Sequence, residues 1–282
     1  MMTKNVHPEY FKIVLAAVIW GSSGAFVKYL NLPSTVLAFF RLAIPTLILG
    51  AYFIVRRESL FGNKITWLLI ASVINAVRLI FFYIGFLNAP IGNAVIMLYT
   101  WPVFAVLFSY LFLKEPVPVR NRILLSFAMT GIVIIYLDKP FSLDHDVFWG
   151  MTAMLISSAL YSTTVVIFKK ESIRYNHLQL VFFQNLIGAG IFLPLFLLNM
   201  SALTAHTSWV ASGYALLVGI IGFGLFFSAL RNVKASTASF LAYIEVISAI
   251  LFGIFLFHET LTWNVITGGI LIIGSSVILK KS

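Results

Sequence analysis

The sequence predicts an all-α integral membrane protein with ten transmembrane helices, arranged as two inverted five-helix repeats with both termini in the cytoplasm. Three observations lead to this fold class. Of the 282 residues, 61% are hydrophobic and only 10% are charged, whereas soluble domains carry about 25% charged residues. Long apolar runs follow one another along the chain, and basic residues gather in every second connection. The two halves also share residues at a fixed spacing.

The apolar runs are long enough to cross a bilayer, which takes roughly 20 residues per helix. The first run follows Lys4 and Lys12, as a signal peptide would, but no small-residue cleavage site comes after it. We therefore expect a retained helix, and the chain between the runs is too short for a soluble enzymatic domain. The ten runs cover residues 11–30, 34–55, 65–87, 91–113, 121–137, 147–168, 178–198, 209–230, 235–257 and 263–279.

The distribution of basic residues predicts the orientation. With a cytoplasmic N-terminus, fifteen of the nineteen Lys and Arg residues lie in inside segments, and only Lys28 and Lys139 lie outside. Arg41 and Arg78 fall within spans. This asymmetry explains the net charge of +10 without a nucleic-acid partner. The inside residues are Lys4, Lys12, Arg56, Arg57, Lys64, Lys114, Arg120, Arg122, Lys169, Lys170, Arg174, Arg231, Lys234, Lys280 and Lys281.

An internal repeat relates residues 1–140 to residues 141–282. An offset of 144 superposes the fourth apolar run on the ninth, and each unit contains five spans. An odd number of spans makes the second copy enter the membrane upside down, which is typical of secondary transporters. The identities at this offset include Asn88 with Asn232, Tyr99 with Tyr243, Ala105 with Ala249, Phe108 with Phe252 and Glu115 with Glu259.

Motifs along the whole chain resemble the EamA-like family of the drug/metabolite transporter superfamily. They are Ile19-Trp20-Gly21-Ser22-Ser23, Phe40-Arg41, Tyr99-Thr100-Trp101-Pro102-Val103-Phe104 with Leu113-Lys114-Glu115, and Tyr243-Ile244-Glu245-Val246 with Phe257-His258-Glu259. The resemblance implies a metabolite carrier that works by alternating access, usually outward. Val246 stands where the family usually has a proline, so we expect a straighter helix there than around Pro102.

Ionisable residues within the spans are the first candidates for a site, because each costs about 2.5–3.5 kcal/mol at mid-membrane. Glu245 lies near the middle of the ninth run, Arg78 near the middle of the third and Arg41 slightly outside the middle of the second. The repeat pairs Glu245 with Trp101 and Arg78 with Gly222. Positions that the repeat relates to each other are expected to lie near one pseudo-symmetry axis. The sequence therefore predicts a central cavity around Glu245, Trp101 and Arg78.

Helical spacing extends the expected lining of this cavity. We expect Gly222, with Gly219 and Gly224, to leave room in the eighth run, and Tyr99 and Tyr243 to be packing residues on another face. An alternative role for Glu245 is a purely structural ion pair with Arg78 or Arg41. The further residues expected to line or rim the cavity are Asn75, Phe82, Asn93, Met97, Phe104, Thr237, Leu241, Ser248, Arg41, Trp20 and Tyr83.

An acid, a guanidinium and aromatic rings suit a small zwitterion with an apolar body. The leading hypothesis is an exporter of amino acids or related amphipathic metabolites in the bacterial inner membrane. Arg78 would bind the carboxylate, Glu245 the ammonium, and Trp101 and Phe82 the side chain. Alternative cargoes are nucleobases, S-adenosylmethionine-like cofactors and organic cations, and a passive channel is the alternative of a different class.

No cofactor, metal or catalytic activity is expected. The chain has no cysteine, its five histidines lack metal-ligand spacing, and no two His, Asp or Glu residues share a predicted membrane depth. The expected partners are a small-molecule substrate and the lipid bilayer. The sequence leaves open whether the protein is a monomer or a homodimer and whether Glu245 carries a coupling proton.

Overall fold

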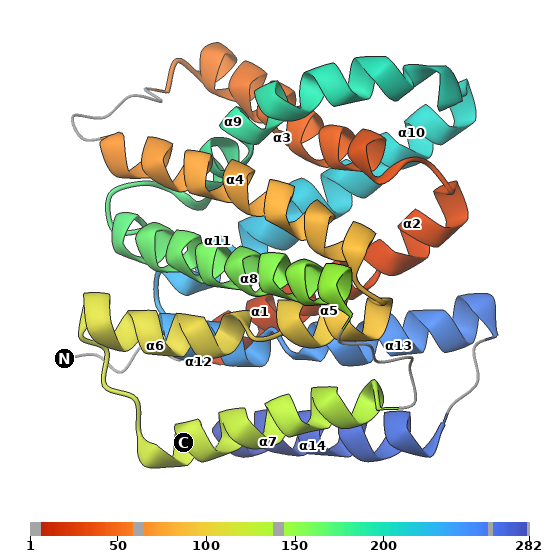
Figure 1. The fold of residues 1–282 in the computed structure, drawn as a ribbon. Coiled ribbons are helices and arrows are strands. Elements are labelled where there is room, and N and C mark those ends of the chain that lie inside the picture. Colours follow the sequence, from red (N-terminus) through yellow and green to blue (C-terminus); the bar gives the residue numbers. More distant parts are fainter. Residues whose placement is uncertain (1–6, 59–64, 138–143, 259–261, 281–282) are drawn as a thin grey trace.

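The computed structural model describes residues 7–58, 65–137, 144–258 and 262–280, and its regular elements in these ranges are all helices (Figure 1). This confirms the predicted all-α class. The expected boundary between the repeats, at residues 140 and 141, lies outside the described residues. So do five residues used to predict the orientation and the repeat: Lys4, Lys64, Lys139, Glu259 and Lys281.

The first half of the chain follows the expected runs closely, with two of them divided. The first run is divided at Ser22, and the fourth at Tyr99 and Thr100. The helices are α1 (His7–Gly21), α2 (Ser23–Leu30), α3 (Ser34–Arg56), α4 (Thr66–Asn88), α5 (Ile91–Leu98), α6 (Trp101–Leu113) and α7 (Val119–Ile135).

In the second half the eighth and ninth runs are divided. Two helices begin with capping boxes, in which Asn176 and Thr204 accept hydrogen bonds from backbone N–H groups of the first turn. The elements are α8 (His145–Glu171), α9 (His177–Asn199), the 3₁₀ turn η1 (Met200–Ala202), α10 (Ala205–Tyr214), the π-helix η2 (Ala215–Gly222), α11 (Phe223–Leu230), α12 (Ala235–Leu241), α13 (Ile244–Phe257) and α14 (Trp263–Lys280).

Within the part of the chain that the structure describes, eight helical stretches are long and apolar enough to cross a membrane by length and composition. Two further helices occupy the places of the fifth and tenth predicted spans. In α14 a shorter apolar stretch covers Trp263–Ile278, and α7 has 17 residues and begins with Arg120 and Arg122 in its first turns. The count of ten spans and the cytoplasmic termini stay predictions.

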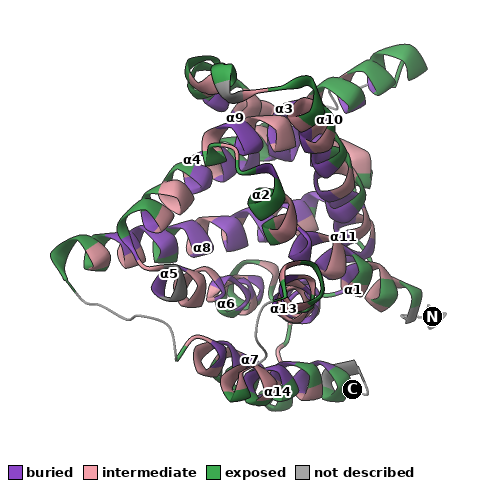
Figure 2. Ribbon diagram, turned by 90° about the vertical axis from the view of Figure 1, so that its right-hand side faces the viewer, coloured by how far each residue is buried: buried purple, intermediate pink, exposed green. Residues whose placement is uncertain are grey.

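Packing follows the two-fold relation between the repeats. The α3 helix packs on its counterpart α9, and α7 packs on its counterpart α14. The contact of α4 with α8 has its equivalent in the contact of α11 with α1. Figure 2 shows buried residues along α8 in the middle of the bundle, while α7 and α14 lie side by side at one edge in both views.

Glycines bring the helices of two of these pairs close together. A Cβ on Gly131 of α7 would lie 2.7 Å from the carbonyl oxygen of Gly268 in α14. In the α4–α8 pair, a Cβ on Gly150 would lie 2.9 Å from the backbone nitrogen of Ala89. Small residues at such crossings allow the van der Waals packing that holds helices together in lipid.

The breaks in the fourth and ninth runs lie at equivalent places. The first separates α5 from α6 at Tyr99 and Thr100, and the second separates α12 from α13 at Ala242 and Tyr243. The expectation of a straighter ninth run is therefore wrong. Although this run has no proline, its chain turns more tightly here than in an α-helix, because Glu245 N–H donates to the carbonyl of Ala242, three residues back, at 2.9 Å.

Hydroxyl groups from other helices satisfy the carbonyls that the break after α5 frees. Pro102 has no N–H for the Leu98 carbonyl, which accepts from Ser158 Oγ of α8 at 2.8 Å. Val103 N–H donates to Thr100 rather than to Tyr99, and the Tyr99 carbonyl accepts from the Tyr243 hydroxyl at 2.9 Å. Irregular backbone within a membrane needs such partners, and here Ser158 of α8 and Tyr243, both in the second repeat, supply them.

Candidate substrate cavity

A cavity of about 700 Å³ lies between the two repeats. Its walls include Val27 of α2, Ser34 at the start of α3 and Phe86 near the end of α4, so it lies toward the end of the bundle that is opposite the N-terminus. Seven residues expected from the sequence line it: Glu245, Arg78, Trp101, Phe82, Arg41, Trp20 and Tyr83.

Three other predicted residues do not line this cavity and make contacts between helices instead. The Asn75 side chain is fully buried and donates to the Gln184 carbonyl of α9 at 2.9 Å. Asn93 donates to the Met151 sulfur of α8 at 3.3 Å. The carbonyl of Met97 accepts from Ser158 at 2.8 Å, and its side chain packs against a cluster that includes Met154 of α8. Phe104, Thr237, Leu241 and Ser248 are also absent from the lining.

Arg78 is held against aromatic rings. Its guanidinium carbon lies 4.8 Å from the centre of the Tyr161 ring and 5.8 Å from that of Phe82, both cation–π distances. Its carbonyl accepts from Ser157 of α8 at 3.0 Å, which fixes the backbone of α4 at this point. Arg41 has a similar arrangement on the other wall, 5.1 Å from the centre of the Phe223 ring.

Glu245 enters the cavity from the first turn of α13, immediately after the helix break. The Tyr99 hydroxyl lies close to its carboxylate, to which it can donate. Among the described residues, neither Arg41 nor Arg78 has an ion pair within 4.0 Å of any carboxylate. The structural ion pair considered from the sequence is therefore not formed in this conformation.

Aromatic side chains form much of the remaining wall. The Trp20 ring lies 4.8 Å from the ring of Phe223, and Trp101 packs edge-on against Tyr161 at 4.9 Å. The indole N–H of Trp20 has no hydrogen-bond partner among the described residues. An apolar body can lie against these rings while charged groups fix its orientation.

The lining residues that sequence reasoning missed include Tyr99 and Tyr161. The prediction that Tyr99 points away from the cavity assumes an unbroken helix, in which each residue is rotated by about 100° from the one before it. The helix breaks at Tyr99, so that rotation does not apply. Tyr161 belongs to a polar stripe with Ser157 and Ser158 in an otherwise apolar run, and this stripe is a signal that points to it.

The glycines of the eighth run have a different role from the expected one. A Cβ on Gly222 would lie 2.8 Å from the indole nitrogen of Trp20, and a Cβ on Gly219 would lie 2.6 Å from the Pro45 ring. These glycines allow α1 and α3 to pack closely on the π-helix. They do not leave free space in the cavity, and neither residue lines it.

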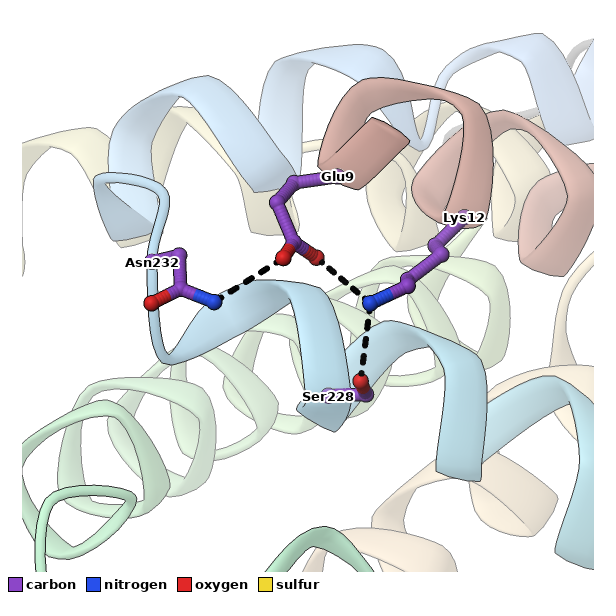
Figure 3. Close-up of polar contacts among 4 residues, drawn as sticks. All are labelled: Glu9, Lys12, Ser228 and Asn232. Carbon is purple, nitrogen blue, oxygen red and sulfur yellow. Dashed lines mark hydrogen bonds and ion pairs between the residues drawn. The ribbon is translucent and has the colours of Figure 1, made fainter. Parts of the chain in front are cut away.

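Polar contacts join the two repeats at the end of the bundle nearer the N-terminus (Figure 3). Glu9 of α1 binds Lys12 at 3.0 Å and accepts from Asn232, in the connection before α12, at 2.9 Å. Lys12 also donates to Ser228 of α11 at 3.3 Å. These four residues, the inner cluster, tie α1 to the second repeat at the end of the bundle away from the cavity.

A second contact between the repeats lies at the same end. The Glu115 carboxylate, after α6, accepts from the backbone N–H of Ala235 at the start of α12, at 2.9 Å. A carboxylate at this position also interacts favourably with the helix dipole of α12. Burial raises the pKa of the Glu115 carboxyl above its usual value.

Comparisons with known proteins agree with this architecture. The model of the EamA-like transporter family matches residues 7–137 and again residues 148–280. The chain is 26% identical over 276 residues to the pseudopaline exporter CntI of Pseudomonas aeruginosa, covering 95% of this chain and 94% of that protein. It is 27% identical over 271 residues to an uncharacterized transporter of Archaeoglobus fulgidus, covering 94% of each.

More distant matches also extend over nearly the whole of this chain. Solute carrier family 35 member G1 of Mus musculus is 22% identical over 283 residues, which cover 94% of this chain and 76% of that protein. One solved crystal structure superposes with a TM-score of 0.81 at 16% identity, covering 96% of this chain and 98% of the other, which shows the shared fold.

Proposed function

Since the chain belongs to the EamA-like transporter family, it is a membrane transporter, and we propose that it exports amino acids or related amphipathic metabolites by alternating access. One observation carries this proposal. Glu245 from the second repeat and Arg78 from the first line the same aromatic-walled cavity without forming an ion pair with each other. Both charges are thus available to a ligand that carries the opposite ones.

Each residue has a role in this proposal. Arg78 binds the carboxylate of the cargo, because its planar guanidinium keeps N–H donors at its edge while its face lies on Tyr161. Glu245 binds the ammonium group, and Tyr99 orients the carboxylate through its hydroxyl. Trp101 and Phe82 contact the apolar part of the cargo. We place the protein in the bacterial inner membrane, with a small molecule as its partner.

The outward direction is supported by the pseudopaline exporter, which is named for export of its cargo. On the predicted topology, the inner cluster lies at the cytoplasmic end of the bundle and the cavity lies toward the other end. Transport then requires this cluster to open when the cavity faces the cytoplasm. Glu245 is also the residue that we propose as the carrier of a coupling proton.

Counterflow in proteoliposomes tests the proposal. Vesicles are loaded with unlabelled amino acids, and uptake of trace labelled aromatic and aliphatic amino acids is followed. A carrier gives transient accumulation, which Glu245→Gln and Arg78→Ala should abolish. Matched controls are Glu58→Gln and Arg122→Gln, whose side chains are exposed outside the cavity. Unchanged transport in both cavity variants would refute the roles given to these residues.

Two alternatives make different predictions in the same assay. A passive channel gives flux without counterflow accumulation. An organic-cation carrier needs Glu245 and the aromatic rings but tolerates Arg78→Ala. Two guanidinium groups in the lining disfavour a simple cation as cargo, because they repel it. Proton coupling predicts that a pH gradient drives uptake in the wild type and no longer does so in Glu245→Gln.

A further inference from the structure

The charges that line the cavity do not balance. Its ionisable acidic and basic side chains are Arg41, Arg78 and Glu245, so two guanidinium groups face one carboxylate and the formal net charge is +1. A zwitterion with one carboxylate and one ammonium, as in the proposed function, pairs with Arg78 and Glu245. It leaves Arg41 without a counter-charge.

The protein itself does not supply that counter-charge. In the part of the chain that the structure describes, neither guanidinium has a carboxylate oxygen within 4.0 Å. The Nε atoms of Arg41 and Arg78 are buried and have no hydrogen-bond partner there. Only 6% of the Arg78 residue is exposed, so the desolvation of this cation is not offset by bulk water.

The two cations also act on each other. Arg41 and Arg78 are close enough for electrostatic repulsion, and Glu245 attracts both without contacting either. The Tyr99 hydroxyl lies close to its carboxylate. Buried like charges are unfavourable in a medium of low dielectric constant. An arrangement of this kind becomes favourable when a bound ligand brings a second negative charge.

Each of the two cations lies over an aromatic ring of its own. Arg78 lies on Tyr161 and Arg41 lies on Phe223, which belong to different helices. A guanidinium that stacks on a ring through its face still presents N–H donors at its edge, in the geometry that binds a carboxylate through two hydrogen bonds. The cavity therefore offers two separate carboxylate-binding positions and one position for a cation.

We propose that the natural cargo carries two acidic groups and one amine on an amphipathic body, with a net charge of −1. This inference rests on the proposed function and specifies its substrate class. One carboxylate binds Arg78, the second binds Arg41, and the amine binds Glu245. The apolar part of the cargo lies against Trp20 and Trp101.

A matched pair of probes tests the second carboxylate alone. γ-Glutamyl-phenylalanine has two carboxylates, one amine and an aromatic ring, and its C-terminal amide differs by the loss of one carboxylate. Binding of each is measured by calorimetry on the whole protein in lipid nanodiscs. A charge-assisted hydrogen-bonded contact corresponds to about tenfold or more in affinity, so the diacid should bind at least about tenfold more tightly than the amide.

The variant Arg41→Gln assigns this preference to one residue. It should weaken binding of the diacid about tenfold or more and leave binding of the amide within about twofold, so that the preference disappears. Arg122→Gln, which removes an exposed arginine outside the cavity, should preserve the preference. A monodisperse elution profile and a cooperative melting transition show that each variant is folded.

Three results would overturn the inference. They are equal or tighter binding of the amide by the wild type, an equal loss for both probes in Arg41→Gln, and no binding of either probe by folded protein. Counterflow separates this failure from failure of the proposed function. If neutral amino acids show Glu245-dependent counterflow while the diacid has no advantage, only the charge inference fails. If no amino acid shows counterflow, the proposed function fails as well.

Discussion

The Tyr243 hydroxyl links the two helix breaks, and its removal has a predictable cost. Tyr243 is fully buried, and its hydroxyl donates to the Tyr99 carbonyl at 2.9 Å. In Tyr243→Phe the ring keeps its packing, but this carbonyl loses its donor, because Val103 N–H already donates to Thr100. A buried acceptor left without a partner costs about 1–3 kcal/mol, and interhelical hydrogen bonds in membranes contribute about 1–2 kcal/mol in model peptides and up to about 1.7 kcal/mol in double-mutant cycles.

The expected destabilisation is therefore about 1–2 kcal/mol, a change of about five- to thirtyfold in the ratio of folded to unfolded protein. Reversible unfolding in mixed micelles measures it. Tyr110→Phe is the matched control, since it removes the same atom from an exposed side chain of α6. If Tyr243→Phe were no less stable than Tyr110→Phe, the hydroxyl would not be the group that satisfies the break, and the reasoning would be refuted.

Three further predictions concern packing, closure and pH. Gly131→Ala should lower stability by about 1–3 kcal/mol, because its Cβ would lie 2.7 Å from a carbonyl oxygen of α14, whereas Gly190→Ala, with no atom within 4 Å of the new Cβ, should not. Glu9→Gln weakens the inner cluster. A single cysteine introduced at the buried position Ile13 should therefore react faster with a maleimide in the Glu9→Gln protein than in a protein that keeps Glu9. An equal rate in the two proteins would count against closure by this cluster. Burial raises the pKa of Glu115 in the folded state, so its contribution to stability is present at low pH and is lost as the pH rises through that pKa. The melting temperature of the wild type relative to Glu115→Gln should therefore fall from acidic to neutral pH, and a rise would contradict this sign.

Much of the fold was predictable because it depends on length, composition and charge distribution. The apolar runs became helices near their expected bounds, and the repeat at an offset of 144 appears in the packing of α3 with α9 and of α7 with α14. The division of the runs was harder to predict. Pro102 signals the first break, but the equivalent break before Val246 has no proline and is formed by a tighter turn of the backbone.

The structure places Arg78, Trp101 and Glu245 along one cavity, as the sequence predicted for these charged and aromatic residues, and their binding roles stay predictions. Helical phase alone was a poorer guide. Asn75 lies on the same face of α4 as Arg78 by spacing, yet its side chain meets the Gln184 backbone of α9 because a neighbouring helix covers that turn. Which turns of a helix meet a neighbour and which meet a cavity depends on tertiary packing, which one sequence does not specify.

The two repeats are alike in backbone and unlike in charge, and this difference has a consequence for transport. Arg41 and Arg78 come from the first repeat and Glu245 from the second, while the breaks beside Trp101 and Glu245 are equivalent. A ligand that binds Arg78 and Glu245 together bridges the repeats, and it stabilises whichever arrangement keeps those side chains at the right separation. An empty cavity lacks that bridge. On the proposed mechanism, occupancy of the cavity therefore biases the movement of one repeat against the other, and a ligand that neutralises only one side chain should bind without being transported.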